Sequence, residues 1–182
     1  MALKATIFKA ELTVSDLDRG HFATHALTLA RHPSETDERM MVRLLAFALN
    51  ADERLDFGRG LSGEDEADLR LDDLTGAIDL WIDVGLPDER AIRKASGRAR
   101  RVAVYAYGTG AQLWWRQNAA AMGRLANATV VDLPVETTRA LAARAARNMK
   151  LQCTIQEGHV WLADDEVSLA IEPRVLQRPA RD

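Results

Sequence analysis

The sequence contains a single cysteine, Cys153, among its 182 residues. One cysteine excludes an intrachain disulfide framework and a zinc site built from several cysteines, and it favours a reducing, cytoplasmic setting. Long apolar runs are missing too: none approaches the roughly 20 residues that a transmembrane helix needs. The N-terminal residues also lack the apolar stretch of a signal peptide. The sequence therefore predicts a cytoplasmic protein with no membrane partner.

An excess of positive charge is also missing. Lys and Arg number 24 and Asp and Glu number 27, which gives a formal net charge of −3. This balance excludes a strongly basic, histone-like nucleic-acid binder but allows a local basic groove. The hydrophobic content of 47% is typical of globular chains. We expect a single domain over residues 1–182, large enough to hold a core without disulfides or structural metal.

Hydrophobic patterns predict strands that alternate with helices. The predicted strands cover residues 5–14, 22–29, 69–71, 77–84, 102–107, 129–133, 151–155 and 160–162. The predicted helices cover residues 35–50 and 87–96, a segment from the 108–110 turn to about 125, and residues 136–149. This order indicates an α/β fold: a mixed central β-sheet flanked by helices, with N- and C-terminal β-hairpins.

Acidic residues concentrate before and within the strand predicted at 77–84. Residues 52–73 hold nine acids against three arginines, a local charge of −6. Glu66 and Asp68 lie two positions apart, so on an extended segment both carboxylates point to one face. In the following strand, one face is apolar and the other carries Asp79 and Asp83. Two groups of carboxylates are therefore available for a cation or for solvent.

Asp79 and Asp83 cannot share one small cation, because four residues of strand separate them by about 13 Å. Asp79 could instead hold an arginine or cap a turn. A partner for Asp83 must come from a neighbouring strand, and Asp68 is the natural one, since it lies fifteen positions earlier, which allows a turn and a return strand. Mg²⁺ commonly takes one or two protein carboxylates plus water. A solvated acidic face beside a turn explains the same spacing, and on spacing alone it is the more frequent outcome.

Several segments together resemble the YaeQ family of bacterial proteins over essentially the whole length. They are Leu27–Glu35 (LTLARHPSE), Glu38–Met41 (ERMM), Asp79–Gly85 (DLWIDVG), Pro87–Arg90 (PDER), Lys94–Ala95 and Trp114–Trp115. The family is similar in fold to the PD-(D/E)XK nuclease superfamily. The resemblance implies a nuclease-like core and metal-assisted hydrolysis of phosphodiesters, with Mg²⁺, or Mn²⁺, as cofactor. A shared fold does not by itself confer the activity.

The resemblance also implies a set of metal ligands. Asp68 and Asp83 fall at the two acidic positions of the nuclease pattern and would hold the metal, together with Glu66. Glu35, near the start of the first long helix, resembles the helix acid that often completes such sites.

Two positions depart from the nuclease pattern. Ala67 stands where a proline is expected, and Gly85 stands where the strand lysine is expected. Lys94, on the following helix, is expected to supply the missing ammonium, either to orient a water molecule or to stabilise charge in the transition state.

Cations after the acidic strand predict a surface for phosphates. Residues 86–101 carry a local charge of +4, and Arg90, Arg93 and Arg98 are the predicted nucleic-acid-binding residues. The same cations also suit an ordinary soluble helix. Two functions from different classes therefore remain: a metal-dependent nuclease, and a non-catalytic protein of nuclease fold that binds nucleic acid or a protein partner. A small-molecule phosphoesterase is a weaker third.

Overall fold

The computed structural model describes residues 4–58 and 65–180. The strands are β1 Thr6–Asp16, β2 His21–Arg31, β3 Leu55–Phe57, β4 Leu69–Asp72, β5 Ile78–Val84, β6 Ala99–Tyr107, β7 Ala128–Leu133, β8 Asn148–Gln156, β9 His159–Ala163, β10 Ser168–Ile171 and β11 Arg174–Gln177. The helices are α1 Asp37–Leu49, α2 Glu89–Arg98, α3 Ala111–Met122 and α4 Val135–Ala142. In the described part of the chain, no helix is long and apolar enough to cross a membrane.

The strands form two mixed sheets, whereas the sequence predicted one central sheet. The first has the order β10-β9-β8-β1-β2 and the second the order β11-β7-β6-β5-β4-β3. Both predicted terminal hairpins are present, as β1–β2 and β8–β9. They lie in the same sheet because β8 pairs in parallel with β1. The α/β class is therefore confirmed, and the single central sheet is corrected to two.

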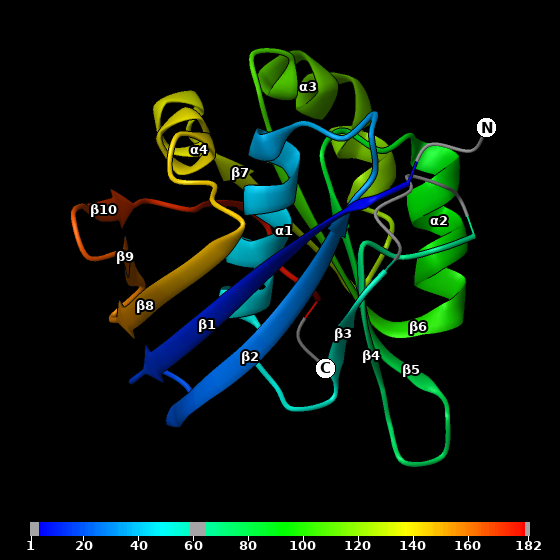
Figure 1. Ribbon diagram of the computed structural model, residues 1–182. Coiled ribbons are helices and arrows are strands. Elements are labelled where there is room, and N and C mark those ends of the chain that lie inside the picture. The colour runs from blue at the N-terminus through cyan, green and yellow to red at the C-terminus, as the bar shows by residue number, and fades with distance from the viewer. Residues whose placement is uncertain (1–3, 59–64, 181–182) are drawn as a thin grey trace.

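Helix α1 lies between the two sheets (Figure 1). All residues from Met40 to Ala48 are buried, because apolar side chains of both sheets surround the helix. This first core joins Leu12 and Leu29 of one sheet to Ile82 of the other. A second core, which contains Trp81, Ile92 and Trp114, lies on the opposite face of the six-stranded sheet, under α2 and α3.

From Leu80 onward, the two faces of β5 divide between these two cores, as the alternation predicted. Ile78, expected on the apolar face, instead packs against the second core, next to a register shift between β4 and β5. Leu80, Ile82 and Val84 belong to the first core. Trp81 belongs to the second core and is only 1% exposed. Helix α2 covers this second face, so Asp83 on the same face is buried rather than solvated.

The C-terminal third differs most from the prediction. A helix was expected over 136–149, but α4 ends at Ala142 and β8 begins at Asn148. Alternate residues of β8, such as Met149 and Leu151, are buried against the first core. Pairing with β1 therefore overrides the helix propensity of the alanine-rich stretch. The short strands β3, β10 and β11 were not predicted, because three or four residues carry little periodic signal.

The helix starts are shifted by one or two residues. Thr36 caps α1, since its side chain accepts a hydrogen bond from the Arg39 amide. Asp88 caps α2 in the same way, through the amide of Ala91. Helix α2 also continues past its predicted end at residue 96, so Gly97 lies inside it. These caps direct the first turns of both helices toward the end of β5, where the acidic residues gather.

Candidate functional site

Asp68 and Asp83 lie opposite each other where β4 begins and β5 ends. The antiparallel register pairs Leu69 with Ile82, so one further step places Asp68 across from Asp83. Side chains directly opposite on two strands have Cβ atoms about 4.5–5.5 Å apart. Asp68 Oδ2 accepts a hydrogen bond from the Val84 amide at 2.8 Å. The structure thus brings together the two acids that the sequence analysis paired across neighbouring strands.

Asp83 is a buried carboxyl group beside another acid. Burial, together with the negative charge of Asp68, raises the pKa of this carboxyl group from 3.8 to about 7. A hydrogen bond from Trp81 Nε1 to Asp83 Oδ1, at 3.0 Å, and the positive charge of Arg39 act in the opposite direction. Because this carboxyl group exchanges its proton near neutral pH, an added cation would favour its ionised form.

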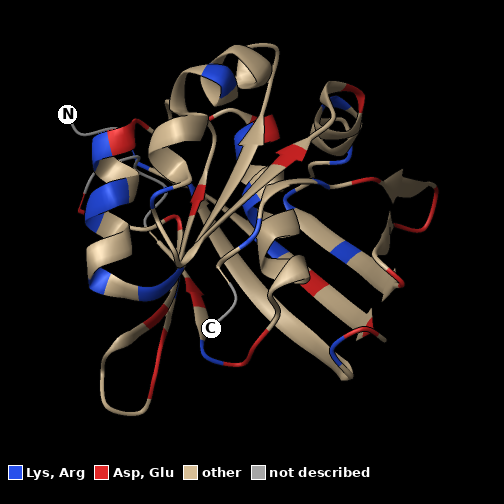
Figure 2. Ribbon diagram, turned by 180° about the vertical axis from the view of Figure 1, so that it is seen from behind, with Lys and Arg blue, Asp and Glu red and all other residues tan. Residues whose placement is uncertain are grey.

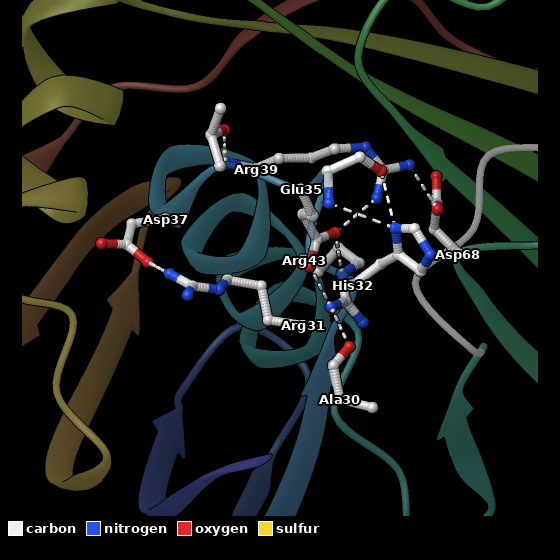
Figure 3. Close-up of polar contacts among 10 residues, drawn as sticks. Ala30, Arg31, His32, Glu35, Asp37, Arg39, Arg43 and Asp68 are labelled. Carbon is white, nitrogen blue, oxygen red and sulfur yellow. Dashed lines mark hydrogen bonds and ion pairs between the residues drawn. The ribbon is translucent and has the colours of Figure 1, made fainter. Parts of the chain in front are cut away.

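A chain of ion pairs links Asp68 to the start of α1 (Figure 3). Arg39 donates from Nη2 to Asp68 Oδ1 and from Nη1 to Glu35 Oε2, each at 2.6 Å. The fully buried Arg43 holds Glu35 through two further bonds, at 2.9 and 2.6 Å. Glu35 therefore reaches the aspartate pair through Arg39. Neither arginine was predicted from the sequence, because a spacing of four residues is equally typical of a solvent-exposed helix face.

A pocket of about 320 Å³ opens beside these groups. It lies between the first turn of α1, the acidic ends of β4 and β5, and the first turn of α2. Its lining residues are Arg39, Glu66, Asp68, Asp83, Val84, Gly85, Leu86, Pro87, Asp88 and Ala91. Among the described residues of this lining, four acids accompany one arginine, so their summed formal charge is negative.

Lys94 is not one of the described residues that line this pocket. Its ammonium group forms an ion pair with the exposed Asp65 instead. Glu66 lines both this pocket and a neighbouring one of about 430 Å³. The cation beside the two aspartates is therefore Arg39, from a different helix than the one the sequence analysis used.

The backbone at Gly85 explains why no lysine stands at the end of β5. Gly85 has a φ of 101°, and its amide donates to the Tyr105 carbonyl at 2.9 Å. Glycine adopts this conformation without steric cost, whereas a residue with a side chain is strained there. The strand needs glycine at this point to keep its last hydrogen bond to β6.

The arginines predicted to bind nucleic acid lie on α2, where acids accompany them (Figure 2). Arg93 pairs with Glu89 at 3.3 Å, and Arg98 stacks over the Trp81 ring at 5.4 Å. Arg90 is exposed in the first turn of the helix. The surface therefore carries less uncompensated positive charge than the count of basic residues suggested.

The remaining acid of β5, Asp79, lies away from the pocket. It accepts a hydrogen bond from Arg101 Nη2 at 2.8 Å. Holding an arginine is one of the two roles that the sequence suggested for Asp79 in place of metal binding. In residues 4–58 and 65–180, no group of three or more His, Cys, Asp or Glu side chains is arranged to hold a metal ion. Any metal at this site would therefore rest on the two aspartates and on water.

Comparisons with known proteins agree on one family. The family model described as YaeQ protein matches residues 1–173. The uncharacterized protein YaeQ of Escherichia coli (strain K12) is 51% identical over 183 residues, which cover 99% of this chain and all of that protein. Its Salmonella typhi counterpart is 52% identical with the same coverage.

Two solved structures share the fold. The crystal structure of the YaeQ protein from Xanthomonas axonopodis pv. citri superposes with a TM-score of 0.92 at 53% identity. The superposition covers 96% of this chain and 99% of the Xanthomonas chain. The YaeQ protein from Pseudomonas syringae gives a TM-score of 0.91 at 38% identity, with 96% and 97% coverage.

Proposed function

The chain belongs to the YaeQ family, and from this premise we propose that it is a divalent-metal-dependent phosphodiesterase of the PD-(D/E)XK nuclease type. Its substrate class is nucleic acid, and its active site is the pocket at Asp68 and Asp83. The observation that carries the proposal is the pair of buried carboxylates facing each other in a pocket. Such a pair is costly to keep ionised unless a cation joins it.

The two aspartates fit a hydrated Mg²⁺ ion better than a closed site of protein ligands. Mg²⁺ usually keeps several waters and binds through one or two carboxylates together with substrate phosphates. Two opposed carboxylates and a pocket of about 320 Å³ suit that mode of binding. Glu66, also in the lining, would contribute through a bound water.

Each ligand is oriented by a neighbour in the described chain. The Val84 amide holds one oxygen of Asp68, and the Trp81 indole holds one oxygen of Asp83. Leu86, Pro87 and Ala91 contribute apolar side chains to the lining of the pocket. When bound, the metal would polarise a phosphoryl oxygen and lower the pKa of a water molecule. The protein's part is to fix the two carboxylates and to shape the cavity beside them.

The test is cleavage of labelled single- and double-stranded DNA and RNA in Mg²⁺ or Mn²⁺. Asp68→Asn and Asp83→Asn should each abolish cleavage, because each removes one metal ligand. Asp79→Asn is the matched control: it removes the same charge from β5 but from a residue bound to Arg101. Cleavage that survives Asp83→Asn would assign the activity to a contaminant or another site and refute the proposal.

A non-catalytic binding function is the second candidate, and two observations favour it. Arg39 already pairs with Asp68, and Gly85 stands in the lysine position. In that case the acids and Arg39 would form a structural network beside a surface for nucleic acid or a protein. Binding of a labelled oligonucleotide without cleavage in any divalent cation would favour this candidate over the first.

A further inference from the structure

Arg39 holds a position that no other described cation shares, since it alone supplies positive charge to the pocket lining. Building on the proposed phosphodiesterase, we infer that Arg39 is the group that contacts the substrate phosphate. A divalent cation on Asp68 and Asp83 would displace its guanidinium from Asp68 and make it available for that contact. This assigns to an α1 arginine the electrostatic role that was expected of a lysine.

The contacts of Arg39 suit a group with one fixed and one exchangeable partner. It donates to Glu35 with Nη1 and to Asp68 with Nη2, which uses two of the five N–H donors of a guanidinium. Its side chain is 13% exposed, so it is held in place yet reaches the pocket. An arginine that lost only the Asp68 bond would remain anchored by Glu35.

The Glu35 anchor does not depend on Arg39. Arg43 binds both oxygens of Glu35 from a fully buried position. A shift of Arg39 toward a substrate would therefore leave Glu35 paired, and the start of α1 intact. Figure 3 shows the arrangement, with Arg43 and Arg39 on successive turns of α1 and Asp68 beyond them.

Competition for Asp68 supplies the driving force for release. A divalent ion on Asp68 and Asp83 neutralises both carboxylates and repels the neighbouring guanidinium. The freed edge of Arg39 can then take a phosphate in the two-pronged geometry that guanidinium groups favour. Lys94 cannot compete for this role without leaving Asp65, and a lysine at position 85 would be strained by the positive φ of the backbone there.

The inference predicts that Arg39 and the metal oppose each other, which a purely structural arginine would not do. Isothermal titration of Mg²⁺ alone into Arg39→Gln should show about tenfold tighter binding than into the wild type, because a competing charge is gone. Arg39→Lys, which keeps the charge, should stay near the wild type. Titration of a thymidine dinucleotide in Ca²⁺ should show at least a roughly tenfold loss for Arg39→Gln and an intermediate loss for Arg39→Lys.

Arg101→Gln is the matched control, because it also breaks an arginine–aspartate pair. Its partner is Asp79, which lies about 13 Å along β5 from Asp83. It should leave both affinities unchanged. Circular dichroism would confirm that each variant is folded. Unchanged or weaker Mg²⁺ binding by folded Arg39→Gln, or unchanged dinucleotide binding, would overturn the inference. When Arg39→Gln gives one of these negative results, the wild type and Asp83→Asn separate the two claims. If the wild type gives no Mg²⁺ heat, the proposed function fails as well. If the wild type binds Mg²⁺ and Asp83→Asn does not, the metal site stands and only the role of Arg39 fails.

Discussion

Replacing Asp83 by Asn should make the protein more stable, and increasingly so as the pH rises. In metal-free buffer, burial raises the pKa of Asp83 from 3.8 to about 7, and Asp68 contributes to the same shift, while Trp81 and Arg39 oppose it. Between these two pKa values the native state binds more protons than the unfolded state. The free energy of unfolding of the wild type therefore falls as the pH rises through this window. The variant has no carboxyl group to ionise, so it avoids this loss.

The size of the effect follows from the same pKa. One pKa unit is worth about 1.4 kcal/mol, and about two pH units separate pH 5 from the folded-state pKa. The stability difference between Asp83→Asn and the wild type should therefore grow by about 2–3 kcal/mol from pH 5 to pH 8. Urea denaturation in a chelator at both pH values measures it directly.

Two comparisons decide whether this reasoning holds. Asp79→Asn removes the same charge from the same strand, but at a partly exposed site paired with Arg101. The pH-dependent gain in the free energy of unfolding should be confined to Asp83→Asn. Parallel pH profiles of the wild type and Asp83→Asn would show that Asp83 is ionised in the folded protein at both pH values, and the account of a costly buried carboxylate would be wrong.

Three further substitutions test other parts of the fold, each by urea denaturation. Gly58→Ala should lower the free energy of unfolding by about 1–3 kcal/mol, because its Cβ would meet the Ala67 carbonyl oxygen at 2.2 Å. Gly97→Ala, which has open space around it, is the control and should be neutral or mildly stabilising. Equal effects of the two substitutions would contradict this prediction. Gly85→Lys should lower the free energy of unfolding by about 1–3 kcal/mol, because residue 85 has a positive φ, and it should not increase cleavage. A stable and more active variant would show that the backbone tolerates a lysine there. Arg43→Met should lower the free energy of unfolding by about 3–5 kcal/mol, since it leaves the buried carboxylate of Glu35 with one partner fewer. A change below about 1 kcal/mol would contradict the importance of this buried ion pair.

Local patterns predicted much of what surrounds the site. From Leu80 onward, the alternation in β5 correctly separated its apolar face from the face of Trp81 and Asp83. Spacing along the chain also indicated Asp68 as the partner of Asp83, and it suggested an arginine as one of two roles for Asp79. These inferences succeeded because strand geometry repeats every two residues and a hairpin-like return can be read from the chain. Their metal-binding role stays a prediction.

Other features of the site depend on contacts between distant segments. Nothing in the spacing of Arg39 distinguishes it from a solvent-facing helical arginine. Its role depends on the approach of Asp68, which lies 29 residues away. Lys94 was the better candidate by sequence, yet Asp65 binds it at the surface. Charged side chains are long and flexible, so their partners are set by packing rather than by position along the chain.

Much of the order of helices and strands, the two hairpins and the two faces of β5 from Leu80 onward were encoded in the amino-acid pattern, because backbone geometry imposes short periods that a reader can recognise. The parallel pairing of β1 with β8, the separation into two sheets and the burial of Asp83 under α2 arose only on folding. Each of these joins segments far apart in the chain or depends on which layer covers which face. Burial and charge pairing are properties of that packing, and they decide the chemistry of this pocket.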